Sequence, residues 1–77
     1  MNDGDKAQFK ELFDGLCEVY DKDKMSKMAL QIYFEALKRF DVGQVLAASS
    51  AHLSDTNHGT FFPKVADIVR QLSLIHI

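Results

Sequence analysis

Apolar side chains recur at intervals of three and four residues through most of this chain, which is the spacing of amphipathic helices. The pattern predicts four helices, at residues 6–20, 26–40, 42–54 and 63–72. The first has one apolar stripe, whereas the second is apolar almost all round. We therefore expect the second helix to lie centrally or to carry an interface for another protein. The predicted fold class is all-α, a small bundle of four helices.

Polar residues at the predicted helix starts support these boundaries. Ser26 or Asp23 is expected to cap the second helix. Two capping boxes are expected at the first and third helices, formed by Asp5 with Gln8 and by Asp41 with Gln44. Gly15, within the first helix, is expected to permit close approach of a neighbouring helix.

The chain's only proline follows two phenylalanines, in the sequence Phe61-Phe62-Pro63. Proline suits the first position of a helix because its missing N–H costs nothing there, and it pushes the preceding residue toward extended geometry. We therefore predict that Phe61 and Phe62 form a short extended arm, with one or both plugging the bundle. Pro63 is predicted to start the fourth helix.

The last six residues, Leu-Ser-Leu-Ile-His-Ile, depart from the amphipathic pattern. They are the translation of CTG TCT CTT ATA CAC ATC, which resembles the transposon-end adapter used in sequencing libraries. We therefore predict that residues 1–71 are a single native helical domain and that residues 72–77, including His76, are adapter translation. The alternative is a genuine apolar helix end.

Composition narrows the functional classes. The chain has 77 residues and a net charge of −2, from 11 acidic and 9 basic residues. It therefore lacks the basic excess of a dedicated nucleic-acid binder, and direct nucleic-acid binding is not expected. No stretch approaches the ~20 apolar residues of a membrane span, so no membrane association is expected. The lone Cys17 cannot form an internal disulfide and suits a reducing cytoplasm.

The connection between the first two predicted helices begins like a calcium-binding loop. Asp21 and Asp23 occupy its first and third positions. However, Ser26 replaces the turn glycine, and Ile32 stands where a bidentate glutamate is needed. A solvated linker is the better interpretation.

No other set of residues has the spacing of a chemical site. His52, Asp55 and His58, with Cys17 as a fourth ligand, do not match a zinc-binding pattern. Cys17 beside the apolar stripe is better explained as a buried filler than as a nucleophile. Phosphate-binding loops, nucleophile elbows and paired carboxylates are also missing from the sequence. We therefore predict no catalytic residue, no metal ligand and no cofactor, in a protein that is not an enzyme.

The second predicted helix carries the residues that we expect to bind a partner protein. Its adjacent aromatics Tyr33 and Phe34 point about 100° apart on a helix, so a domain this small covers at least one incompletely. The predicted partner-binding residues are Leu30, Phe34 and Lys38.

A set of residues from the second helix onward resembles the phage helicase loader and inhibitor family. The set is structural: Tyr33 with Leu37, Phe40 before the polar Asp41, Val45 and Ala48, and then Phe61, Phe62 and Pro63. The resemblance covers most of residues 7–71. It implies a small helical domain with a flexible tail that binds the hexameric replicative helicase, inhibits it and delivers it to an origin-bound replication organiser. In that family the tail carries much of the helicase contact, and here it is absent or replaced by residues 72–77.

The resemblance thus implies a phage DNA-replication adaptor. Two alternatives stay open, a small DNA-binding regulator with a helix-turn-helix and a structural phage helical module. Against the regulator, the third predicted helix lacks the arginine, lysine and asparagine side chains that read bases.

Overall fold

The computed structural model describes residues 1–75. After a 3-10 turn at Asp3–Asp5, it contains four helices: α1 (Lys6–Val19), α2 (Lys27–Leu37), α3 (Val42–Leu53) and α4 (Val65–Ile75). No strand occurs in residues 1–75, so the predicted all-α fold is confirmed. The predicted boundaries hold for α1 and α3, whereas α2 ends at Leu37, three residues early. The prediction about His76 lies outside the described residues.

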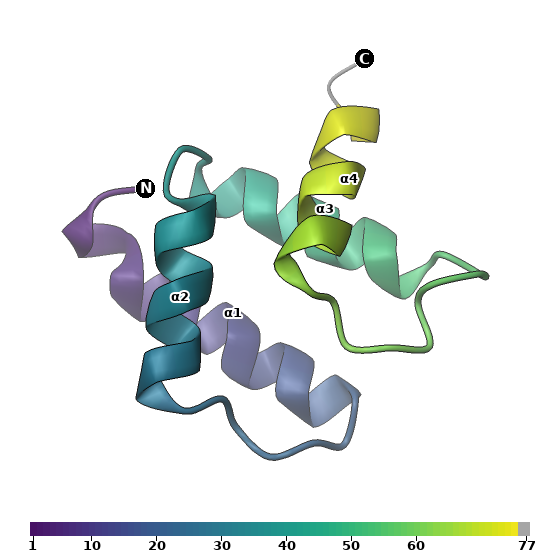
Figure 1. Ribbon diagram of the computed structural model, residues 1–77, viewed down its shortest axis with the longest axis horizontal. Helices are drawn as coiled ribbons and strands as arrows, with labels where there is room; N and C mark the ends of the chain where they lie inside the picture. Colours follow the sequence, from purple (N-terminus) through teal and green to yellow (C-terminus); the bar gives the residue numbers. More distant parts are fainter. Residues whose placement is uncertain (76–77) are drawn as a thin grey trace.

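The helices form two layers in a molecule measuring 32 × 30 × 16 Å. Figure 1 shows α2 and α4 in front, with α1 and α3 behind them. α4 packs chiefly on α3, while α2 contacts both α1 and α4. The side of α2 that faces neither neighbour is left to solvent.

One core joins all four helices. Phe9 is its centre on α1, with its ring 4.7 Å from Phe13 and edge-on to Phe34 at 5.3 Å. Such pairs stabilise a fold by roughly 0.5–1.5 kcal/mol beyond the burial of their area. The buried members are Phe9, Phe13, Leu16, Phe34, Leu37, Val45, Ala48, Ile68 and Leu72. Leu72 therefore packs in the core, and α4 continues to Ile75, three residues beyond its predicted end. That residues 72–77 are adapter translation stays a prediction.

Two of the three predicted helix caps are confirmed. Ser26 Oγ accepts a hydrogen bond from the Ala29 amide at 3.1 Å and caps α2. Gln44 Oε1 accepts from the Asp41 amide at 2.9 Å, which completes the capping box of α3. The short polar side chains at these positions therefore define where α2 and α3 begin.

The predicted capping box at the start of α1 is wrong. Asp5 already has helical backbone angles, because the 3-10 turn runs directly into α1. N-cap residues normally have extended backbone angles, and the Asp5 side chain makes no capping hydrogen bond to α1. Instead, the Asp5 carboxylate accepts from the Asn2 amide at 3.0 Å, so the capping box lies one turn earlier.

The connector between α1 and α2, residues 20–26, begins with a turn that ends α1. Asp21 has a positive φ of 52°, and the amides of Asp21 and Lys22 donate to the carbonyls of Glu18 and Cys17 at 3.1 and 2.9 Å. This is a Schellman motif with aspartate at the left-handed position. The calcium-like start of this segment thus has a structural explanation.

The prediction that Pro63 starts the fourth helix is wrong by two residues. α4 begins at Val65, because the Lys64 amide donates to the Asp67 carboxylate at 2.9 Å and Lys64 takes the capping position. Pro63 is buried just before it, and its carbonyl accepts from the Tyr33 hydroxyl at 3.0 Å. The proline therefore anchors the arm to α2.

Of the two phenylalanines in the arm, only Phe62 reaches the core. Its ring lies 6.5 Å from Phe13 and 5.7 Å from Tyr20. Phe61 is 71 % exposed, so the prediction that one or both rings plug the bundle is confirmed through Phe62 alone. Successive residues of a non-helical segment point in different directions, and the burial of Phe62 turns Phe61 outward.

Asp55 organises the loop between α3 and α4. Its carboxylate accepts from the amides of Asn57 and His58 at 2.8 and 3.0 Å, and Arg70 lies 3.7 Å away. The two backbone donors, first Asn57 and then His58, lower the pKa of Asp55 below its ordinary value. The loop is thereby tied to α4 through a charged carboxylate.

Candidate partner-binding surface

α2 exposes two large apolar side chains on its outer side. Met28 is 75 % exposed and Ile32 is 60 % exposed. They are four residues apart, so they lie one above the other on the same face of the helix. This face is separate from the one that buries Phe34 and Leu37 in the core. The structure thus places α2 at the surface, with one buried and one exposed apolar face.

The three residues predicted to bind a partner have different surroundings. Phe34 is only 2 % exposed, because its ring packs edge-on against Phe9, so its prediction as a surface contact is wrong. Leu30 is half-buried and packs on the rim of the core. Lys38 is exposed at the end of α2.

The residues that carry the family resemblance on α2 and just after it are structural, as predicted. Leu37 is fully buried. Tyr33 and Phe40 are partly buried and pack against the core. Tyr33 also lies edge-on to Phe13 at 5.3 Å, and the guanidinium of Arg39 lies 4.7 Å from the Phe40 ring centroid.

A groove with a volume of about 510 Å³ runs between α1 and α2. Its floor is apolar and consists of Phe9 from α1, Met25 from the connector, and Leu30 and Phe34 from α2. The two phenylalanine rings are almost fully buried, whereas Met25 and Leu30 are half-buried. The accessible part of the floor is therefore aliphatic.

Lysines surround this floor. Lys6 and Lys10 come from α1, Lys24 from the connector, and Lys27 from the first position of α2. Asp14 is the one acidic residue among those that line the groove, so four lysines against one aspartate give a local charge of +3. The whole chain has the opposite sign, −2.

Asp14 joins the two sides of the groove. Its carboxylate lies 2.7 Å from Lys10 Nζ and 4.0 Å from Lys24 Nζ. The hydrogen bond from Lys10 is the main cause of a lowered pKa at Asp14, which keeps the carboxyl ionised. Lys6 Nζ lies 5.3 Å from the Phe34 ring centroid, above the buried floor.

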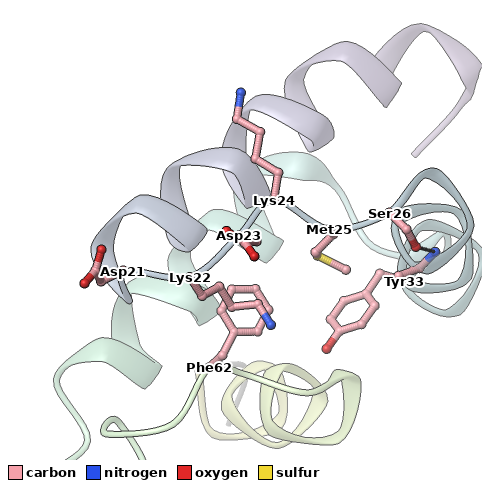
Figure 2. A pocket seen from close by; sticks show the side chains of 9 residues that line it. Asp21, Lys22, Asp23, Lys24, Met25, Ser26, Tyr33 and Phe62 are labelled. Carbon is pink, nitrogen blue, oxygen red and sulfur yellow. Dashed lines mark hydrogen bonds between the residues drawn. The ribbon is translucent and has the colours of Figure 1, made fainter.

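A second, more open hollow of about 690 Å³ lies between the α1–α2 connector and Phe62 (Figure 2). Lys22 Nζ lies 4.8 Å from the Phe62 ring centroid and covers it. Figure 2 shows the carboxylates of Asp21 and Asp23 well apart, and Lys24 pointing away from the hollow. This arrangement provides no convergent set of ligands.

Cys17, His52 and His58 do not form a chemical site. Cys17 and His52 are both buried, and His52 Nε2 donates to the Phe61 carbonyl at 2.8 Å. His58 is exposed in the loop, 3.4 Å from Asp55. Within residues 1–75, no three histidine, cysteine, aspartate or glutamate side chains lie together in a way that holds a metal ion. The visible role of His52 is to hold the arm against α3.

The groove was not evident from the sequence because its lysines come from two separate segments. Lys6, Lys10 and Asp14 follow one another at four-residue intervals beside the apolar stripe of α1, which was a detectable signal of one charged edge. The approach of Lys24 and Lys27 to this edge depends on how the connector folds back, and that is a tertiary feature.

Comparison with protein-family models, with curated proteins and with solved structures found no match to this chain. No helix within residues 1–75 has the length and apolar character needed to cross a bilayer.

Proposed function

We propose that this chain is a phage DNA-replication adaptor that binds the hexameric replicative helicase, holds it inactive and helps to load it at the origin. It acts by binding other proteins, the helicase and an origin-bound replication organiser, in the cytoplasm of the bacterial host. It uses no catalytic group and no cofactor. The resemblance carried by Tyr33, Leu37, Phe40 and the Phe61–Pro63 arm supports the choice of partner.

The observation that carries the binding role is the exposure of Met28 and Ile32 on one face of α2. A domain of this size needs most of its apolar residues for its own core. Covering such a side chain completely is worth roughly 1.5–3 kcal/mol. Exposed apolar residues on one helix face are typical of a surface that another protein covers.

The same geometry weighs against a helix-turn-helix regulator. α3 would be the recognition helix, yet its sequence contains no lysine or arginine. Gln44, which has a side chain able to read adenine, instead accepts a hydrogen bond from the Asp41 amide at 2.9 Å. The residues of α3 thus serve helix capping and packing.

Sedimentation velocity with the replicative helicase of the same genome tests this proposal. We expect the chain to move with the helicase at micromolar concentrations. Met28→Gln combined with Ile32→Gln should weaken the complex at least about tenfold, because it removes the apolar contacts but keeps a helix-forming side chain.

The matched control is Leu46→Gln combined with Leu53→Gln. These residues are also exposed, at 51 % and 40 %, but lie on α3. This control variant should bind the helicase like the unmodified chain. Absence of a complex at micromolar concentrations, or equal weakening by both pairs, would contradict the proposal.

A further inference from the structure

We propose that the groove between α1 and α2 binds an acidic amphipathic segment of a partner protein. The apolar side chains of the segment enter the aliphatic floor, and its carboxylates meet the lysine rim. This inference deepens the proposed function, and rests on it for the partner being a protein.

The floor of the groove fits the apolar face of a short helix. Met25 and Leu30 offer half-buried aliphatic surface, and methionine adapts its shape to different partners. Below them, Phe9 and Phe34 are fixed edge-on at 5.3 Å, so the base of the groove is rigid. Grooves between two helices commonly receive a third amphipathic segment through anchors spaced at three and four residues.

The rim supplies the charge that selects an acidic segment. Lys10 and Lys24 already share Asp14. The ion pair of Lys6 is weaker, because its ammonium lies 3.7 Å from the Asp3 carboxylate and the Asp3 side chain is 89 % exposed. Lys27 stands on the opposite side of the groove, at the first position of α2. Carboxylates on the segment would therefore meet Lys6 and Lys27 on either side of its apolar face.

A single-stranded nucleic acid fits this groove less well than a peptide does. Proteins that bind single strands combine a basic groove with aromatic rings on which the bases stack. The aromatic rings of this floor belong to Phe9 and Phe34, which are 1 % and 2 % exposed. They are not available for stacking, whereas the aliphatic surface of Met25 and Leu30 is open to apolar side chains.

Fluorescence anisotropy tests the inference directly. The probe is a fluorescein-labelled helical peptide of about 14 residues, with leucine and phenylalanine on one face and glutamate on the other. One control peptide has lysine in place of each glutamate, and a second has serine in place of each apolar residue. We expect only the first peptide to bind, with an affinity that falls as salt is added.

The decisive protein variant is Lys6→Glu combined with Lys27→Glu. Both lysines occupy the first position of a helix, where glutamate is favourable to the helix dipole. A loss of binding therefore reflects the groove and not unfolding, which circular dichroism checks. We expect affinity for the acidic peptide to fall about tenfold or more. Lys64→Glu, an exposed lysine outside the groove, makes the same type of charge change and should leave binding unchanged.

Three results would overturn the inference: equal binding of the lysine or serine peptide, unchanged binding by the double variant, or preferential binding of a single-stranded oligonucleotide. The peptide assay contains no helicase, so its outcome is separate from that of the sedimentation experiment. Helicase binding without peptide binding rejects the groove alone. Peptide binding without helicase binding rejects the helicase as partner alone.

Discussion

Truncation of Phe62 to alanine tests how the arm before α4 is held. The Phe62 ring packs on Phe13 and Tyr20 at centroid distances of 6.5 and 5.7 Å, and Lys22 covers its outer side at 4.8 Å. Phe61, the adjacent residue, is 71 % exposed. Phe62→Ala and Phe61→Ala remove the same atoms, the first from a half-buried ring and the second from an exposed ring.

The expected magnitude follows from burial. A fully buried phenylalanine costs about 3–5 kcal/mol on truncation to alanine. Because Phe62 is half-buried, we expect Phe62→Ala to lower the free energy of unfolding by about 2–3 kcal/mol. Phe61→Ala should cost less than about 0.5 kcal/mol, since its ring is in solvent and its carbonyl still accepts from His52.

Urea denaturation followed by circular dichroism measures both values. For a small domain with a slope near 1 kcal/mol per molar urea, Phe62→Ala should lower the midpoint by about 2–3 M. That is a large part of the stability of a domain of this size. Equal midpoints for the two variants would refute the conclusion that Phe62, and not Phe61, anchors the arm.

Three further outcomes follow from the loop and the helices. Gly59→Ala should destabilise the fold by about 1–3 kcal/mol, because its Cβ would lie 2.5 Å from the Asp55 carbonyl oxygen. Gly15→Ala should instead stabilise α1 by about 0.5–1 kcal/mol, since a Cβ there meets nothing within 4 Å. A thermal denaturation in which the Gly59→Ala variant is more stable than the Gly15→Ala variant would contradict both predictions. The lowered pKa of Asp55 contributes stability that is present above the ordinary aspartate pKa and lost as the pH falls through the lower folded value. Asp55→Asn should therefore be less stable than the unmodified chain at neutral pH, and this gap should close on acidification below about pH 4; a gap independent of pH, measured by urea titrations, would disprove that role for the charge.

The sequence was sufficient for the fold class because periodic apolar positions are a local signal. Ser26 and the pair Asp41–Gln44 were also sufficient to place the starts of α2 and α3, since capping depends on a few adjacent residues. Asp5 shows that a suitable residue near a helix start does not always form the predicted cap. The 3-10 turn before α1 gave it helical backbone angles, and its capping partner became Asn2.

The predictions that failed depended on tertiary contacts. Gly15 was expected beside a neighbouring helix, yet the close backbone approach occurs at Gly59, where α3 turns into the loop. Phe34 was expected to bind a partner, but it is buried against Phe9, and Tyr33 is the aromatic residue that stays incompletely covered. Which aromatic residue of a helix is buried depends on the neighbour that it meets, and a single sequence does not specify that neighbour.

The candidate surface was only partly predictable. The expected partner-binding residues on α2 included Leu30, which lines the groove. It missed Met28 and Ile32, because apolar residues around a whole helix do not reveal which side faces outward. Their exposure became evident only when the positions of α1 and α4 against α2 were known.

The central claim is that this chain works by presenting the α1–α2 side of the molecule to another protein. Amide chemical-shift mapping of the isotope-labelled chain, titrated with the replicative helicase, tests it most directly. The account predicts that signals from Lys6, Lys27 and Ile32 shift or broaden first, while those from Leu46 and Thr56 on the α3–α4 side stay in place. Changes confined to Leu46 and Thr56, or an unchanged spectrum at saturating helicase, would contradict it.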